Sequence, residues 1–257
     1  MIRVNGAPTE SICAYDRGLA YGDGVFRTLL AHDGEPMHWA LQYAKLESDC
    51  AALGIVCPSE HALLHEARIV ASEHARAAVK IIVTRGIGPR GYSPPPLASP
   101  VCVVSSAAYQ RKNTDGVRAH LCRLRLSRQP ALAGIKHLNR LENVVARAEW
   151  HDADVWEGLL LDADGWVVGG VMSNVFIVEG GVLLTPALTH CGVAGATRER
   201  VMGLMPCSVE TLTLTRLENA DEVFFTNSLI GVWPLIQLGQ KHWMPGPITR
   251  SVRDAIG

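Results

Sequence analysis

A lysine between a glycine and an apolar, helix-like segment is the first residue whose setting could carry chemistry. Lys136 lies in "GIKHLNRLENVVARAEW", residues 134–150, and apolar residues recur after it at the spacing of an amphipathic helix. An amine partly removed from water becomes a better nucleophile, able to attack a carbonyl group. Most lysines are solvated charges. The spacing alone therefore leaves both interpretations open.

A second candidate is the start of a predicted helix over 196–204. In "HCGVAGATRERVM" a glycine-bearing turn leads into Ala196 and Thr197, and charged residues follow. The first backbone N–H groups of a helix lack partners within the helix, and the helix dipole places positive charge there. Such a turn can bind a phosphate group, although ordinary helix capping is the more common explanation of this pattern taken alone.

Other combinations of residues fit less well. His61 and His65 are four residues apart on a predicted helix, but no third ligand accompanies them, so we expect a solvated helix face and no metal site. The glycine-rich "GDGVFRTLL" and "GIGPRG" match neither a Walker loop nor a dinucleotide fingerprint. The sequence has no GxSxG nucleophile motif.

The bulk composition fits a soluble globular protein whose natural partners are small, specific ligands. The chain has 257 residues, 48% hydrophobic and 19% charged, with a net charge of −1. This balance gives no electrostatic footprint for nucleic acid, and no apolar run is long enough to span a membrane. Without a signal-peptide pattern at the N-terminus, we expect a cytoplasmic protein whose seven scattered cysteines are reduced.

The elements that must position these residues fall into two groups. Helical periodicity begins at His38 and again at Glu60, and strand-like runs follow at 78–86 and 100–109. Residues 1–107 therefore form a predicted small α/β domain. The polar segment 108–116 is the predicted linker, and residues 117–257 form a larger domain.

Short strands and tight turns dominate this larger domain. Strands are predicted at 117–126, 156–168, 174–186 and 221–229, with "DADGW" and "EGGV" as hairpin turns. Helices are predicted near 139–150, 196–204 and 247–256. Leu141, Val144, Val145 and Ala148 are expected to form the packed apolar face of the first of these helices. The whole chain is thus of the α+β class.

Several motifs, taken together and in order, resemble one enzyme family. They are "DRGLAYGDGVFRTLL" (16–30), "RGIGPRGYS" (85–93), "LAGIKHLNRLENVVARAE" (132–149), "SNVFIVEGGVLLTP" (173–186), "GVAGATRERV" (192–201) and "ADEVFFTNSLIGVWPL" (220–235). The chain resembles the 4-amino-4-deoxychorismate lyases among the fold-type IV pyridoxal phosphate enzymes, which include the branched-chain and D-amino acid aminotransferases.

The resemblance implies a fold and a cofactor. The expected fold is the two-domain, D-amino acid aminotransferase-like fold, usually a homodimer, with pyridoxal 5'-phosphate between a small N-terminal domain and a larger C-terminal domain. Lys136 would carry the cofactor as a Schiff base. The implied reaction converts 4-amino-4-deoxychorismate to 4-aminobenzoate and pyruvate, a step of folate biosynthesis.

The resemblance also assigns roles to individual residues. Thr28 would deliver or position a proton near the leaving group. Arg90 and Tyr92 fall at substrate-binding positions. The remaining matches are cofactor-binding positions, most of them for the phosphate: Lys45, Asn174, Ala196, Thr197, Ser228 and Leu229.

Three positions depart from the family pattern. Gly169 stands where the family has an acidic residue paired with the pyridine nitrogen, which favours a neutral nitrogen and a weaker electron sink. Lys45 replaces an arginine, so the bidentate grip on the phosphate is lost and weaker cofactor retention is expected. Arg27 occupies a position that many relatives fill with glutamate or threonine, and we expect it to be a surface or interface charge.

Two alternatives to the lyase remain. An aminotransferase on the same fold is disfavoured by Gly169 and by the hydroxyl of Thr28. A family member with weak or no pyridoxal phosphate chemistry is suggested by Gly169 and Lys45 together.

Overall fold

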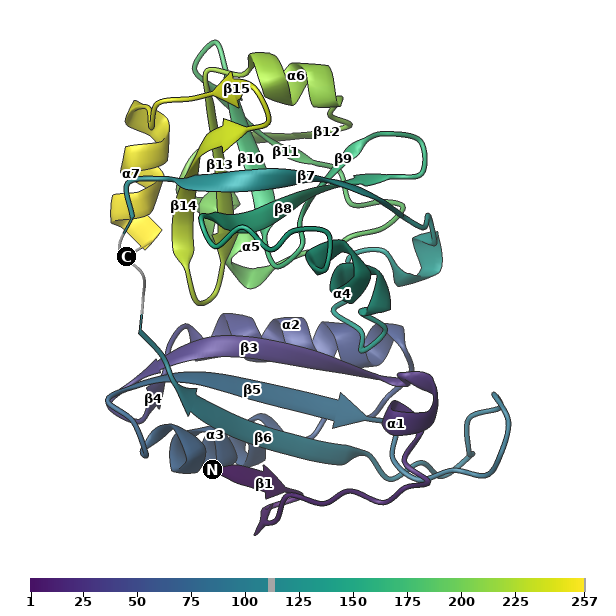
Figure 1. Ribbon diagram of the computed structural model, residues 1–257. Helices are drawn as coiled ribbons and strands as arrows, with labels where there is room; N and C mark the ends of the chain where they lie inside the picture. Colours follow the sequence, from purple (N-terminus) through teal and green to yellow (C-terminus); the bar gives the residue numbers. More distant parts are fainter. Residues whose placement is uncertain (111–113, 257) are drawn as a thin grey trace. The chain divides into compact units, whose positions relative to one another are not determined.

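The structure is a computed structural model that describes residues 1–110 and 114–256 (Figure 1). The described chain divides into two compact units. The first unit contains residues 1–110 together with Ile135–Asn139, and the second contains the remaining described residues. The predicted linker 108–116 includes residues 111–113, which lie outside the described residues. The short segment that carries Lys136 thus belongs to the first unit, although the residues on both sides of it belong to the second.

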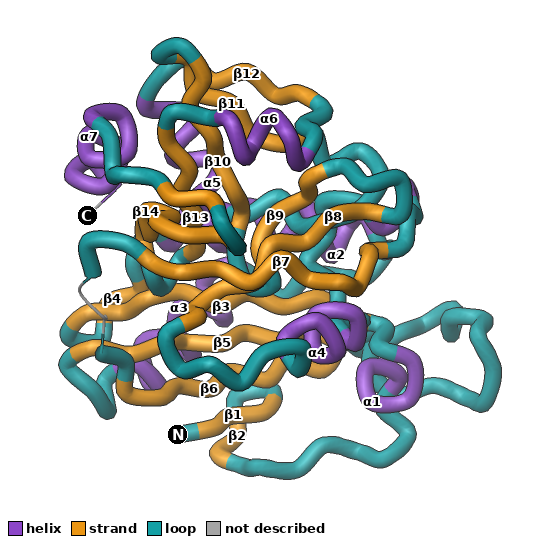
Figure 2. Tube along the Cα trace, turned by 45° about the horizontal axis from the view of Figure 1, so that its top comes forward, coloured by secondary structure: helices purple, strands orange, loops and turns teal. Residues whose placement is uncertain are grey.

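The first unit is built on an antiparallel sheet with the strand order β2-β1-β6-β5-β3-β4. Figure 2 shows β3, β5 and β6 as neighbouring strands. The strands are β1 (Ile2–Val4), β2 (Ala7–Pro8), β3 (Gly24–His32), β4 (Glu35–Pro36), β5 (Arg76–Thr84) and β6 (Val101–Ala108). The helices are α1 (Arg17–Tyr21), α2 (Trp39–Ala52) and α3 (Glu60–Ala71). The sequence predicted α2, β5 and β6 close to these bounds, and it predicted the start of α3 at Glu60, but the helix ends six residues before the predicted end at Ala77.

The core of the first unit explains which strand residues face the helices. Leu46 of α2 and Leu63 of α3 share a buried cluster with Val25 and Leu29 of β3 and with Ile81 of β5. Because side chains alternate across a strand, the odd-numbered residues of β3 and β5 enter this core. Burying such a side chain stabilises the fold by about 1.5–3 kcal/mol. The even-numbered residues project from the opposite face of the sheet.

The second unit contains a larger mixed sheet with the order β12-β11-β10-β13-β14-β7-β8-β9, and β15 pairs with β14. Its strands are β7 (Val117–Leu126), β8 (Val155–Asp162), β9 (Val167–Gly170), β10 (Asn174–Glu179), β11 (Val182–Pro186), β12 (Cys207–Glu210), β13 (Glu222–Asn227), β14 (Gly231–Leu238) and β15 (Lys241–His242). Its helices are the 3-10 helix η1 (Pro130–Leu132), α4 (Leu141–Arg147), α5 (Ala196–Leu204), α6 (Leu214–Asn219) and α7 (Pro247–Ile256).

The predicted hairpins of the second unit are present. β8 pairs with β9 and β10 pairs with β11, both antiparallel. The turns use glycines with positive φ, at Gly165 (85°), Gly180 (55°) and Gly181 (82°). Only glycine adopts this backbone region at little cost. The sequence signals "DADGW" and "EGGV" therefore located both turns.

Helix α4 differs from the prediction in length and in packing. It covers Leu141–Arg147 rather than 139–150. The expected packed apolar face is wrong, because Leu141 is 74% exposed, Val144 62% and Val145 50%. Ala146 is the residue of this helix that enters the core, beside Trp150. The helix is amphipathic, but its larger apolar residues face outward.

The remaining helices are short. Helices α5 and α7 have the bounds that the periodicity predicted, 196–204 and 247–256. None of the helices within the described residues is long and apolar enough to cross a membrane.

Candidate active site

The residues around Lys136 pair with β3 rather than beginning a helix. The Phe26 N–H donates to the Lys136 carbonyl at 3.0 Å, and the Leu138 N–H donates to the Gly24 carbonyl at 2.9 Å. Ile135 enters the core of the first unit. Because side chains alternate, the Lys136 side chain leaves from the other face of the sheet.

The glycines of "GDG" allow this close approach. Gly24 begins β3, and a Cβ atom built there would lie 2.8 Å from Leu138 Cδ1 and 2.6 Å from the Val83 carbonyl oxygen. Gly22 ends α1 in the left-handed region, with φ 66°. The glycine-rich segment that matched no nucleotide-binding motif is therefore explained by the backbone of the Lys136 segment, which passes directly over it.

The Lys136 amine lies on a small group of side chains from β3 and β5. Its Nζ atom is 4.6 Å from the centre of the Phe26 ring, and Lys80 Nζ is 5.2 Å from the same centre. Thr28, two residues after Phe26, is the register partner of Lys80. Side chains of directly paired residues lie on the same face. The Lys136 and Lys80 nitrogens therefore lie over one aromatic ring, and Thr28 is on the same face of the sheet.

Two predicted residues, Lys136 and Thr28, thus lie on one face of the sheet, and the structure adds Lys80 to them. The sequence interpretation missed Lys80 because a lysine in a strand is ordinarily a solvated charge. The sequence did mark Lys80 as unusual, because it interrupts the otherwise apolar run "AVKIIVT". That Lys80 lies beside Thr28 could be learned only from the strand register. An ammonium beside a reactive amine can pair with a carboxylate of a ligand.

The expectation for Arg27 is wrong. Its side chain is 3% exposed and forms an ion pair with Asp49 of α2. Alternation along β3 explains this, because Arg27 has the same parity as the core residues Val25 and Leu29. An Arg27 Nη2–H also donates to the Lys45 carbonyl at 3.1 Å. Lys45 itself is half-buried on α2, one turn before Asp49.

Arg90 and Tyr92 lie in an exposed loop whose backbone is tied down by Arg17. The Arg17 guanidinium donates to the Gly91 and Tyr92 carbonyls, each at 2.9 Å. Both the Arg90 and Tyr92 side chains remain exposed, and Tyr92 is 86% exposed. The loop is thus anchored through its main chain, while the two predicted substrate-binding side chains are available to a ligand.

Asp23 fixes the orientation of Arg17. Its Oδ2 accepts from Arg17 Nε and from Arg85 Nε, both at 2.8 Å. Burial raises the pKa of Asp23, but the two guanidinium groups outweigh burial and hold it below its usual value. Arg17, Asp23 and Arg85 were not predicted as site residues. The sequence offers only their charges in "DRG", "GDG" and "TRG", and the pairing depends on the tertiary fold.

The predicted phosphate cradle in the second unit has a helix start without a side-chain cap. Gly195 is the N-cap of α5 and has no side chain with which to cap it, and Ala196 and Thr197 are buried. Asn174 orders the preceding turn, because its Oδ1 accepts the Gly195 N–H at 3.1 Å and its Nδ2–H donates to the Val193 carbonyl at 2.7 Å. The helix start is available for an anion, and Asn174 supports it.

Ser228 and Leu229 lie in the turn between β13 and β14. Asn227 organises this turn, since its Oδ1 accepts the N–H groups of Leu229 and Ile230, each at 2.9 Å. The Ser228 side chain is half-buried. Both Ser228 and the start of α5 belong to the second unit, whereas Lys136 and Thr28 belong to the first.

The position of Gly169 leaves little space for the acidic side chain that the family has there. Gly169 is buried in β9, and a Cβ atom built on it would lie 2.9 Å from the Ser173 carbonyl oxygen. A buried carboxylate nevertheless lies close by. Glu157 of β8 accepts from Ser173 Oγ at 2.7 Å and from the Gly158 N–H at 2.9 Å, and burial raises its pKa.

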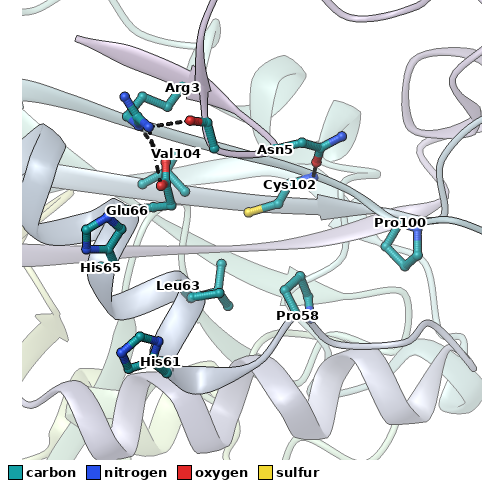
Figure 3. A pocket seen from close by; sticks show the side chains of 12 residues that line it. Arg3, Asn5, Pro58, His61, Leu63, His65, Glu66, Pro100, Cys102 and Val104 are labelled. Carbon is teal, nitrogen blue, oxygen red and sulfur yellow. Dashed lines mark hydrogen bonds and ion pairs between the residues drawn. The ribbon is translucent and has the colours of Figure 1, made fainter.

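A pocket of about 460 Å³ lies elsewhere in the first unit (Figure 3). Arg3 of β1 and Glu66 of α3 meet at its wall in an ion pair of 2.6 Å. The exposed His61 and His65 also line it. Within the described residues, no group of three or more His, Cys, Asp or Glu side chains is arranged to hold a metal ion.

Comparisons with known proteins agree with the resemblance. The family model "Amino-transferase class IV" matches residues 24–238. An aminodeoxychorismate lyase from Vibrio harveyi is 36% identical, covering 91% of this chain and 90% of the relative. A putative branched-chain-amino-acid aminotransferase from Methanocaldococcus jannaschii is 31% identical, covering 95% and 89%.

Solved structures agree with this result. The crystal structure of 4-amino-4-deoxychorismate lyase from Pseudomonas aeruginosa superposes with a TM-score of 0.94 at 42% identity, covering 100% of this chain and 98% of that one. The predicted α+β, fold-type IV architecture is thereby confirmed. From its residues, its fold and these relatives, the chain belongs to the class IV amino-transferase family of enzymes.

Proposed function

We propose that this chain is a pyridoxal 5'-phosphate-dependent lyase that converts 4-amino-4-deoxychorismate to 4-aminobenzoate and pyruvate. The observation that carries the proposal is the group on the face of β3 and β5, where the Lys136 amine and Lys80 share the Phe26 ring and Thr28 is paired with Lys80. The names of the relatives from Vibrio harveyi and Pseudomonas aeruginosa support the same substrate.

The residues present fit the cofactor. Lys136 offers an amine for its aldehyde, and the uncapped start of α5, at Ala196 and Thr197, offers backbone N–H groups for its phosphate. Lys45, Asn174, Ser228 and Leu229 are the further cofactor-binding residues of the proposal. When bound, pyridoxal phosphate supplies a conjugated ring that accepts an electron pair from the substrate.

The protein's own residues then have separate tasks. The Lys136 amine removes the proton from the substrate carbon that bears the amino group. The Thr28 hydroxyl positions the enolpyruvyl ether and delivers a proton as that C–O bond breaks. Lys80, with Arg90 and Tyr92, binds the substrate carboxylates. The elimination breaks one C–H bond and the ether C–O bond with no external oxidant, and formation of the aromatic ring drives it.

An aminotransferase is the second candidate, supported by the name of the Methanocaldococcus jannaschii relative. An aminotransferase must store the electron pair on the cofactor ring, which a carboxylate at the pyridine nitrogen favours. Gly169 supplies no such carboxylate. An elimination that forms an aromatic ring depends less on that storage. The glycine therefore favours the lyase over the aminotransferase.

The first experiment tests the cofactor. Purified protein incubated with pyridoxal phosphate should show a visible absorption band that borohydride bleaches, with the reduced cofactor found on the peptide that contains Lys136. Lys136→Ala should abolish the band and at least 99% of the activity, about 10²-fold or more, as loss of a covalent catalyst requires. Lys241→Ala changes an exposed lysine of β15 and is the matched control.

The second experiment tests the reaction. Released 4-aminobenzoate is measured against transfer of the amino group to a keto acid. Transfer without 4-aminobenzoate would overturn the lyase in favour of the aminotransferase. Absence of any band with excess cofactor would overturn both, and would indicate a family member that has lost this chemistry.

A further inference from the structure

A buried ion pair connects β3 with α2 behind the candidate active site. Arg27 is 3% exposed and Asp49 is 7% exposed, and they pair through Arg27 Nη2 and Asp49 Oδ2. Their neighbours in the core are apolar, among them Leu46 and Cys50. Replacing such a pair with apolar side chains often leaves stability unchanged or increased. Stability by itself therefore does not account for the pair.

The Asp49 carboxylate has a second partner, and an apolar side chain could not replace this contact. The same oxygen, Asp49 Oδ2, accepts the backbone N–H of Lys136 at 3.2 Å. On its other side, the Lys136 carbonyl accepts the Phe26 N–H at 3.0 Å. The peptide groups on both sides of Lys136 are thus held, one by β3 and one by α2. Together these bonds fix the direction in which the Lys136 side chain leaves the backbone.

The Arg27 guanidinium favours the ionised form of the Asp49 carboxyl, which accepts the Lys136 N–H. Burial raises the pKa of Asp49 above its usual value, and Arg27, the Lys136 N–H and Lys45 offset part of this rise. An ionised carboxylate is the stronger hydrogen-bond acceptor. Arg27 also donates to the Lys45 carbonyl at 3.1 Å, which holds the turn of α2 that leads to Asp49.

We propose that Arg27 and Asp49 are positioning residues that hold the backbone of Lys136, and thereby its amine, in the reactive orientation. The proposal rests on the proposed function, in which Lys136 binds the cofactor. The ion pair fixes the carboxylate, the carboxylate fixes the Lys136 peptide, and the peptide directs the side chain toward Phe26 and Thr28. Neither residue touches the substrate in this scheme.

Two uncharged double variants separate positioning from general stability. Arg27→Met with Asp49→Asn removes both charges but keeps an oxygen that accepts the Lys136 N–H. Arg27→Met with Asp49→Leu removes both charges and the acceptor. Arg3→Met with Glu66→Leu is the control, because it removes a different ion pair of the same unit, at the pocket wall (Figure 3).

Hydrogen exchange without cofactor is the first measurement. We expect the peptide that contains Lys136 to exchange about tenfold faster in the Asp49→Leu variant than in the Asp49→Asn variant, the effect of one lost hydrogen bond. The control should leave this peptide unchanged. Equal exchange in the two Asp49 variants would overturn the proposal, whether or not the protein binds pyridoxal phosphate.

Kinetics with cofactor are the second measurement. Misplacing the amine should lower kcat of the Asp49→Leu variant at least about tenfold below that of the Asp49→Asn variant, with KM within about twofold. Equal kcat values would overturn the proposal.

If the Asp49→Leu variant does not fold, the single variant Asp49→Asn is compared with Arg27→Met, in which the Asp49 carboxylate loses its charge partner. Equal hydrogen exchange of the Lys136 peptide in these two variants would also overturn the proposal. Absence of cofactor on the wild-type protein would refute the proposed function and leave the exchange result standing.

Discussion

Two ammonium groups lie over the Phe26 ring, but they are assigned different tasks. Lys136 is held by its backbone on both sides, whereas Lys80 projects from the middle of β5 beside Thr28. A charge that pairs with a substrate carboxylate contributes to binding in the ground state and in the transition state alike. Its loss should therefore appear mainly in KM.

We predict that Lys80→Met raises KM for 4-amino-4-deoxychorismate about tenfold or more while kcat changes less, because a charge-assisted hydrogen bond contributes about 1.5–3 kcal/mol. Steady-state kinetics of 4-aminobenzoate release measure both constants. Lys80→Arg, which keeps the charge, should recover most of the loss. An unchanged KM in Lys80→Met would refute the role of Lys80.

A residue-scale prediction concerns Glu157, whose carboxyl is buried among Ser173 Oγ and backbone N–H groups. Because burial raises its pKa in the folded state, its contribution to stability is complete below the unfolded pKa of about 4.3. That contribution is lost as the pH rises through the folded pKa.

We therefore predict that the free energy of unfolding of Glu157→Gln, relative to wild type, increases from acid toward higher pH. Glu157→Leu should lose about 3 kcal/mol, because the donors around the carboxyl would lack an acceptor. Urea unfolding between pH 4 and 8 measures both variants. A wild-type curve parallel to that of Glu157→Gln over this range would contradict the raised pKa.

At the scale of elements, the loop with Arg90 and Tyr92 depends on α1. Arg17 holds the carbonyls of Gly91 and Tyr92 while Asp23 fixes its guanidinium. Arg17 Cζ lies 4.9 Å from the centre of the Tyr21 ring. The Tyr21 ring also packs edge-on against the Tyr92 ring, with 5.4 Å between the two ring centres. One short helix and its following loop thus order a loop that lies far away in the sequence.

We predict that Arg17→Met loosens this loop and raises KM about tenfold, because the carbonyls lose two charge-assisted hydrogen bonds. The peptide containing residues 89–93 should exchange hydrogen faster, while the peptide containing Lys136 should not. The control is Arg68→Met, which removes the exposed ion pair between Arg68 of α3 and Glu35 of β4. Unchanged exchange at 89–93 would show that Arg17 does not order the loop.

At the scale of the whole molecule, α4 exposes Leu141, Val144 and Val145 on one short helix. Contiguous exposed apolar side chains mark surfaces that associate. The resemblance to fold-type IV enzymes predicts a homodimer, and we propose that a second copy of this chain covers these residues.

We expect the protein to sediment as a dimer at micromolar concentration. Val144→Glu should shift the population toward monomer, because it places a charge in the proposed interface. Val182→Glu makes the same change at an exposed position of β11 and should leave the dimer intact. A wild-type monomer, or equal effects of the two variants, would contradict this interface.

Features that depend on local spacing could be predicted from the amino-acid sequence alone. The bounds of α5 and α7, the glycine turns at Gly165 and Gly180, and the order of motifs around Lys136 and Thr28 could all be read directly. Helical periodicity and left-handed glycines are properties of a few consecutive residues.

Only the tertiary structure decided which distant residues meet. It paired Lys80 with Thr28, buried Arg27 against Asp49, and joined Ile135–Asn139 to β3. That joining also shortened α4, because Leu138 donates to the Gly24 carbonyl and so does not continue a helix. Strand register and burial depend on contacts between segments far apart in the chain, and local spacing does not encode them.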